Sequence, residues 1–378
     1  MTQPTVIRAH CAADILACIP HQLGFVPTSS LVLLSVHAER GKVGLAIRLD
    51  LPDIHTIANP TEFIDYVTGL LIDDAAGMVF IVRYPGPGDP AAPADKSVRR
   101  LADAVGRKVG CVEIWEVGEE RYEQLDPNTW RPTGEGGPTD DLVGTVTAAA
   151  FAAAGSNPLA SRASVGQLPD PPEVDRRKAR RAASRAWDKR TRGGSEGLHA
   201  WRVSMLDVWR RALEDLVSAQ EAGLRELPLD PRVLGEITAG ANDPAVKRGI
   251  VGIIAGRQEL ADRSVLEGDA SVASFDQLLD PRSGVELDPG VSQGAERLLA
   301  VAAAHASKFR KGALFELLAW LAWTLGDGVR ARVECERALE CPGVHSLAGF
   351  VRTALAYGLS PRCPNTARRL LGTDGWAA

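Results

Sequence analysis

One segment of the sequence concentrates positive charge and is suited to binding a polyanion. Between Arg176 and Arg192 nine residues are basic and one, Asp188, is acidic, which gives a local net charge of +8. Guanidinium groups bind phosphate and carboxylate oxygens through paired hydrogen bonds, so the pattern is typical of a surface for nucleic acid or an acidic partner. The alternative is a solvated linker helix whose cations are neutralised by neighbouring Asp and Glu. The candidate binding residues are Arg176, Arg177, Arg180, Arg181, Arg185, Lys189 and Arg190.

Four alanines give the same segment a second face. Ala179, Ala182, Ala183 and Ala186 fall at positions i, i+3, i+4 and i+7, the spacing of one side of a helix. This spacing predicts a helix that docks on its own domain through a narrow apolar stripe and presents its arginines outward.

Charged residues near predicted strand ends form a second candidate site. Arg48 and Asp50 end one predicted strand on the same face, because strand side chains alternate with period two, and Arg83 ends the next. Ligands of α/β sheets tend to sit beyond strand ends, so these residues and Arg162 are candidates for binding a small anion. The alternative is an ordinary salt bridge beside a surface loop.

Recognised catalytic and cofactor motifs are absent from the sequence. It contains no phosphate-binding glycine motif, no dinucleotide fingerprint, no nucleophile elbow and no zinc-protease motif. His10, Cys11, Cys18 and His21 form the tightest cluster of nitrogen and sulfur ligands, but their spacing matches no standard site. We therefore expect no cofactor and no metal.

The elements that carry the strand-end residues alternate between strand and helix. A turn of residues 39–42 joins the first two predicted strands into a hairpin, and a long loop is predicted over 126–141. This pattern predicts an α/β domain with a mixed sheet. The predicted strands cover 31–36, 43–49, 78–82 and 109–117, and the predicted helices start at Asn59, cover 95–108 and cover 139–154.

The rest of the chain has helical periodicity throughout. A proline-rich stretch over 167–172 marks the boundary, so we expect an α/β domain at 1–168, a basic linker or helix at 169–195 and a helical domain at 196–378. The helical pair around Gly326 has the spacing of one tetratricopeptide unit or of a plain bundle hairpin. The predicted fold class is thus an α/β domain followed by an all-α domain, which is either tetratricopeptide-like or a bundle. The predicted C-terminal helices cover 292–307, 313–325, 329–340 and 345–357.

Composition places the chain among globular proteins. Of its 378 residues 45% are hydrophobic and 24% charged, which excludes wholesale disorder, and the net charge of −5 excludes a uniformly basic surface. Only 8 of the 43 basic residues are Lys, the remainder being Arg. Six scattered cysteines favour reduced thiols over a disulfide framework. With no secretory signal and no apolar stretch of membrane-spanning length, a cytoplasmic protein without a membrane partner is expected.

Several short strings along the chain form a recognisable set. They lie at 14–16, 24–27, 30–34, 48–52, 161–162, 318–323 and 326–328. Together these strings resemble the actinobacterial family called domain of unknown function 4192. The resemblance spans nearly the whole chain and is weakest over the basic segment. It implies an actinobacterial origin, which fits the Arg excess, and brings no established activity, cofactor or catalytic residue.

Three functions follow from these patterns. The leading hypothesis is a non-catalytic binding or scaffold protein with a protein partner, because catalytic motifs are missing. The second is an enzyme of unknown class that acts on a small anionic substrate at the strand ends. The third is nucleic-acid binding through the basic helix, with affinity that falls steeply as salt rises.

Overall fold

The computed structural model describes residues 11–37, 43–153, 156–192, 194–224, 228–267, 272–283, 285–357, 359 and 361. The chain divides after Val165 into two compact units, which are described here one at a time. The predicted hairpin turn at 39–42, His10 of the cysteine and histidine cluster, and Cys363 lie outside the described residues.

A six-stranded sheet forms the centre of the first unit, and its mixed character confirms the predicted fold class. The strand order is β2-β1-β3-β4-β5-β6; β3 and β4 are parallel, and every other neighbouring pair is antiparallel. The helix α4 connects the parallel pair, which a tight turn cannot join. The strands are β1 (Ser30–His37), β2 (Val43–Asp50), β3 (Ala76–Tyr84), β4 (Val112–Val117), β5 (Arg121–Leu125) and β6 (Pro132–Pro138).

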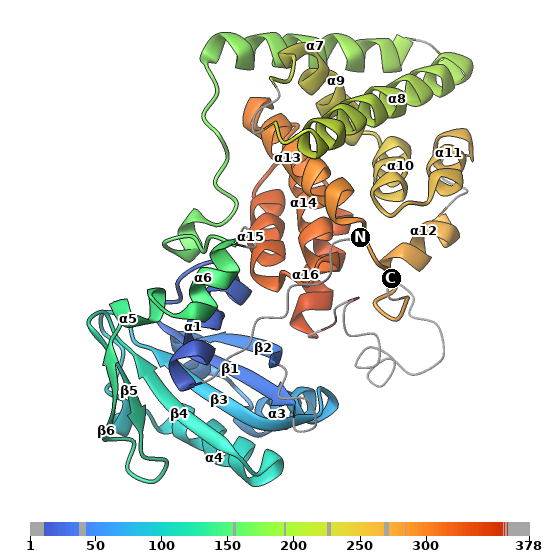
Figure 1. Ribbon diagram of the computed structural model, residues 1–378. Coiled ribbons are helices and arrows are strands. Elements are labelled where there is room, and N and C mark those ends of the chain that lie inside the picture. The colour runs from blue at the N-terminus through green and yellow to red at the C-terminus, as the bar shows by residue number, and fades with distance from the viewer. Residues whose placement is uncertain are drawn as a thin grey trace. The chain divides into compact units, whose positions relative to one another are not determined.

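Helices cover both faces of this sheet (Figure 1). Leu31 and Ile81 point to one face, where they pack with buried residues of α2, α3 and α4. Val32 and Val82, one position further along each strand, are buried on the opposite face, on the side of α1, α5 and α6. The helices are α1 (Ala12–Leu23), α2 (Leu51–Thr56), α3 (Pro60–Asp73), α4 (Lys96–Val109), α5 (Asp140–Val143) and α6 (Val146–Ala153), with short 3₁₀ turns at Ala92–Ala94 and Arg162–Ser164.

Two predicted segments differ from the structure. Residues 126–141, expected as one loop, contain β6, whose glycines and prolines are tolerated because it is an edge strand. Its Gly136 has φ +141°, and a Cβ there would overlap the carbonyl oxygen of Tyr122 on β5. The single helix expected over 139–154 is two helices, α5 and α6, with Gly144 closing α5.

The second unit is built from helices throughout its described residues. The four helices expected at its C-terminal end are present as α13 to α16. Whether they form a bundle or a tetratricopeptide-like array stays a prediction. The helices are α7 (Glu173–Arg192), α8 (Gly194–Glu221), α9 (Pro231–Ala241), α10 (Pro244–Ile254), α11 (Gln258–Glu267), α12 (Val272–Leu279), α13 (Pro289–His305), α14 (Gly312–Thr324), α15 (Gly328–Leu339) and α16 (Ser346–Ala356).

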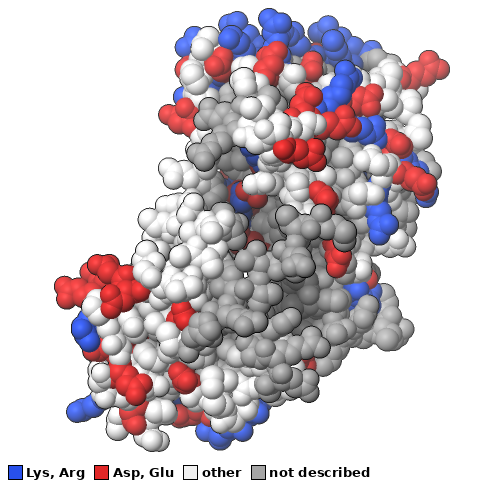
Figure 2. All heavy atoms as spheres, viewed as in Figure 1, with Lys and Arg blue, Asp and Glu red and all other residues white. Residues whose placement is uncertain are grey.

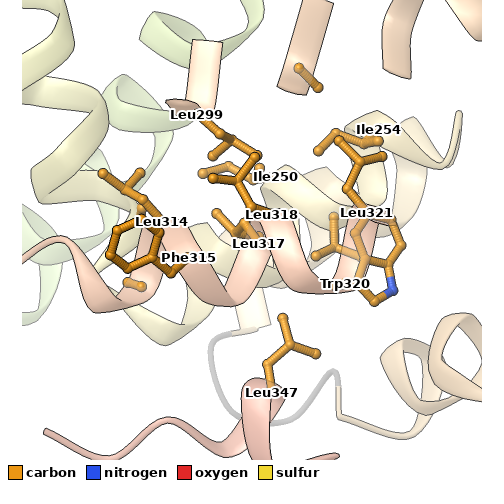
Figure 3. Close-up of a cluster of buried hydrophobic side chains, with 14 of the residues drawn as sticks. Ile250, Ile254, Leu299, Leu314, Phe315, Leu317, Leu318, Trp320, Leu321 and Leu347 are labelled. Atoms are coloured by element: carbon orange, nitrogen blue, oxygen red, sulfur yellow. The ribbon is translucent and has the colours of Figure 1, made fainter. Parts of the chain in front are cut away.

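The helix α14 lies at the centre of the second unit. All of its residues from Gly312 to Thr324 are buried, as expected of a helix that is apolar on every side. Figure 3 shows its leucines and Trp320 surrounded by side chains of three other helices, Ile250 and Ile254 from α10, Leu299 from α13 and Leu347 from α16. This core holds together the helices on which α7 rests.

Candidate functional site

The alanine face of α7 is buried against α9. Ala179, Ala182, Ala183 and Ala186 are each 5% exposed or less, as their spacing predicts. On α9, a Cβ at Gly235 would overlap the carbonyl oxygen of Ala179 and lie 2.8 Å from the Cβ of Ala182. Small residues on both sides therefore let the two helix backbones approach closely.

A buried carboxylate fixes the C-terminal end of α7. Arg190 donates through Nε to Oδ2 of Asp243 at 2.8 Å, and Arg202 of α8 donates to Oδ1 at 3.1 Å. Asp243 also accepts from the backbone N–H groups of Ala245 and Val246, which begin α10. Its side chain is fully buried, so one carboxylate joins α7, α8 and α10. Arg190 is thus held in an ion pair within the helical unit.

Carboxylates neutralise the N-terminal cations of α7. Glu173 lies within 4 Å of Arg176, Arg177 and Arg180. Arg176 also contacts Asp170 at 2.9 Å, and Lys178 pairs with Asp175 at 3.0 Å. In the first two turns of α7, the cations are therefore neutralised by neighbouring Asp and Glu, as the alternative interpretation of this segment expects. Four of the seven binding candidates predicted there, including Arg190, are held in ion pairs within the chain.

The remaining cations form an exposed stripe along α7. Arg181, Arg185, Lys189 and Arg192 are exposed and have no carboxylate partner among the described residues. Their spacing of four, four and three residues places them on one side of the helix over about 17 Å, at about 1.5 Å per residue. Figure 2 shows Lys and Arg side chains gathered along this edge of the molecule. We call these four residues the basic stripe.

Three of the four strand-end candidates meet in the first unit. Arg48 Nη2 lies 2.5 Å from Asp50 Oδ1, and Arg162 Nη1 lies 3.3 Å from Asp50 Oδ2. The guanidinium of Arg48 also lies over the Phe25 ring, 5.5 Å from its centre. Because Asp50 takes up hydrogen bonds from both arginines, the cluster has the character of a closed ion network.

Arg83 lies apart from the other three, and the strand register explains why. Leu31 pairs with Arg83 on one side and with Leu49 on the other, whereas Ser30 pairs with Asp50. Arg83 therefore points to the opposite face of the sheet from Asp50. It is buried there, where it pairs with Glu116 and donates to the carbonyl oxygen of Pro90. Arg83 is therefore separated by the sheet from the other three candidates, Arg48, Asp50 and Arg162.

The thiols and histidines show no sign of shared chemistry in the part of the chain that the structure covers. No group of three or more His, Cys, Asp or Glu residues there is arranged to hold a metal ion. Burial raises the pKa of the Cys18 thiol to about 11 and that of Cys335 to about 12, so both thiols are inert at neutral pH. His21 bonds to Ser156 at 3.0 Å and stacks on Phe151.

The sheet with helices on both faces, the helical unit and the basic stripe define a two-unit α/β and all-α protein. The chain belongs to the family described as Domain of unknown function (DUF4192), whose model matches residues 13–267 and 285–362. No curated protein and no solved structure matches it. Among the described helices, none has both the length and the apolar composition needed to cross a bilayer.

Proposed function

We propose that the protein is a non-catalytic binding protein and that its basic stripe binds nucleic acid. The observation that carries the proposal is a row of four exposed cations, Arg181, Arg185, Lys189 and Arg192, without carboxylate partners in the described chain. Their helix is fixed at its C-terminal end by Asp243, so the backbone that carries the cations needs little reordering to bind. Phosphates along a nucleic-acid backbone repeat at a spacing that such a row can follow.

The surroundings of the stripe favour phosphate over an acidic protein as its ligand. Protein interfaces take most of their binding energy from apolar and aromatic anchors at their centre. The outward side of α7 between Arg181 and Arg192 offers none: its one aromatic residue, Trp187, is half-buried beneath the guanidinium of Arg190. Three of the four stripe cations are arginines, which bind phosphate through two hydrogen bonds at once.

Salt-dependent binding to labelled duplex DNA tests the proposal. Four phosphate contacts predict that affinity falls roughly 100-fold between about 50 mM and about 200 mM salt. Arg181→Glu with Arg185→Glu should weaken binding at low salt by at least about tenfold and flatten the salt dependence. Fluorescence anisotropy measures both quantities.

The matched control carries the same charge change elsewhere. Arg107→Glu with Arg263→Glu alters two exposed arginines, one on α4 and one on α11, and should leave duplex affinity within about threefold. Equal losses in both double variants, or no duplex binding by the unaltered protein at low salt, would remove the nucleic-acid assignment. Capture of an acidic protein through the same arginines in place of DNA would assign the stripe to the protein partner instead.

The proposed setting is the cytoplasm of an actinobacterium. Support comes from thiols that are free in the described chain, at Cys11, Cys18, Cys111, Cys335 and Cys341, and from the Arg-rich composition. Fractionation of an actinobacterial host should recover the protein with the cytosol, and recovery from the culture medium or the membrane pellet would contradict this location.

A further inference from the structure

A small pocket opens beside α7 at the edge of the alanine face, where Ala179 and Ala183 form part of its wall, and next to the end of α13. Its volume is about 60 Å³, and Arg180, Ser184, Thr238, His305, Ser307 and Arg310 supply its polar lining. No carboxylate belongs to this lining. A single water needs about 10–15 Å³ by the same measure, so the pocket has room for a group of several heavy atoms.

Several polar groups of this lining have no hydrogen-bond partner in the described structure. The hydroxyls of Ser184 and Ser307 make no hydrogen bond there, and neither does the guanidinium of Arg310. His305 donates through Nδ1 to the carbonyl oxygen of Val301 at 2.8 Å, which leaves Nε2 for a ligand. Ser184 is exposed, and Ser307 and Arg310 are half-buried, so these polar groups are free to bond to a ligand that enters the pocket.

Arg310 is held in position for this purpose. Its guanidinium lies over the Trp187 ring, 4.9 Å from the ring centre, and its carbonyl oxygen accepts from Asn242 Nδ2 at 2.8 Å. Burial lowers the pKa of Arg310 and the charge of Asp188 raises it, and an arginine so placed stays protonated at neutral pH. The pocket therefore has a fixed cation that no carboxylate of the described chain approaches within ion-pair distance.

We infer that this pocket binds a phosphate group. The charge of Arg310 attracts the anion, and the two serine hydroxyls add donors from α7 and from the turn after α13. Arg180, which pairs with Glu173, adds further donors at the edge of the pocket. A tetrahedral oxyanion presents oxygens in several directions at once, which suits donors that come from separate elements. The site rests on different residues from the basic stripe and does not depend on nucleic-acid binding by the stripe.

Phosphate binding to the purified full chain tests this assignment. Inorganic phosphate, titrated at constant ionic strength against chloride by calorimetry, should bind at one site. Arg310→Met should weaken that binding by about tenfold or more, because the charged hydrogen bonds are lost while an unbranched side chain still fills the space beside Trp187. Asp188→Asn, which removes the nearest opposing charge, should strengthen it. Circular dichroism checks that both variants keep their helices.

Two further experiments test whether this site acts independently of the basic stripe and identify the source of the phosphate. Arg181→Glu with Arg185→Glu should keep calorimetric phosphate binding within about threefold, and Arg310→Met should keep duplex binding within the same limit. A 5′-phosphorylated oligonucleotide that binds more tightly than its dephosphorylated form, only when Arg310 is present, assigns the phosphate to a nucleic-acid end. Equal binding of the two oligonucleotides, with inorganic phosphate still bound, assigns it to a small phosphate compound. Absence of phosphate binding by the unaltered protein, or unchanged binding by Arg310→Met, overturns the site.

Discussion

Arg190 and Asp243 lie 53 residues apart in the sequence, and Arg190 Nε donates to Asp243 Oδ2 at 2.8 Å. Asp243 is the buried residue that directly precedes α10. Asp243 receives two arginines and also caps α10 through Ala245 and Val246. Asp243 therefore fixes the C-terminal end of α7, in addition to the packing of the alanine face on α9.

Asp243→Ala should be among the most damaging single changes in the helical unit. It leaves Arg190 and Arg202 without their carboxylate and removes the cap of α10, so we expect a loss of about 3–5 kcal/mol in the free energy of unfolding. Hydrogen exchange should show the loss of protection in α7 and α10. The exposed Asp188 provides the control, and Asp188→Ala should change stability by less than about 0.5 kcal/mol. Equal effects of the two changes would show that Asp243 is not the anchor.

Gly235→Ala should separate α7 from α9. The added methyl would overlap the carbonyl oxygen of Ala179, so the helices must move apart, at a cost of about 1–3 kcal/mol. Gly349 of α16 is the matched control, because a Cβ there meets nothing within 4 Å. Gly349→Ala should raise stability by about 0.5–1 kcal/mol through helix propensity alone. Urea unfolding of the two variants gives the comparison, and a neutral Gly235→Ala would contradict the close packing.

Glu334 of α15 should make the protein less stable as the pH rises from about 4.5 to about 7. Burial raises the pKa of its carboxyl to about 7 in the folded chain, against the attraction of Arg337 and Arg330, while the unfolded value is 4.5. Because the folded state holds the proton more tightly, folding is favoured at low pH, and the advantage is lost as the pH passes through this window. The shift corresponds to about 3 kcal/mol.

Glu334→Gln provides the readout for this effect. The free energy of unfolding of the variant minus that of the unaltered protein should grow from about zero near pH 4.5 to a few kcal/mol near pH 7.5. Other titrating groups cancel in this difference. A difference that stays constant across the range would rule out the raised pKa.

Replacing Asp50 should lower the stability of the sheet unit more than replacing Arg162 does. The side chain of Arg48 is 9% exposed, so Asp50→Asn leaves a nearly buried cation without its carboxylate and should cost about 1–3 kcal/mol. Arg162 is 31% exposed, and Arg162→Ala should cost no more than about 1 kcal/mol. Hydrogen exchange of the β1 and β2 amides reports on this unit alone. A larger effect from Arg162, or protection of these amides by added phosphate, would favour a ligand site at the strand ends.

Local patterns were enough to predict most elements, and long-range pairing accounts for what they missed. The apolar run over 31–36 and the alanine spacing in α7 predicted β1 and a docked helix, because each pattern depends on one element only. β6 was missed because its sequence, rich in Gly and Pro, has no strand pattern and is stabilised by pairing with β5.

The two candidate sites were only partly predictable for the same reason. The cations of α7 are visible in the sequence, but the pairing of Arg190 with Asp243 follows from helix packing, and the separation of Arg83 from Asp50 follows from strand register. Arg310 gave no sequence signal, because it is a single arginine in a turn more than a hundred residues after α7. Only the fold brings it to Trp187.

The close packing of α7 on α9 makes the fit of the helix independent of the charge that it carries. The side chains at the contact are the methyl groups of Ala179, Ala182 and Ala183. Larger side chains do not fit on this side of the helix. The four positions of the basic stripe are exposed and make no ion pair in the described chain. Substitutions in the basic stripe can therefore change its charge with little effect on folding. The ligand preference of α7 can change in this way while its packing on α9 stays the same.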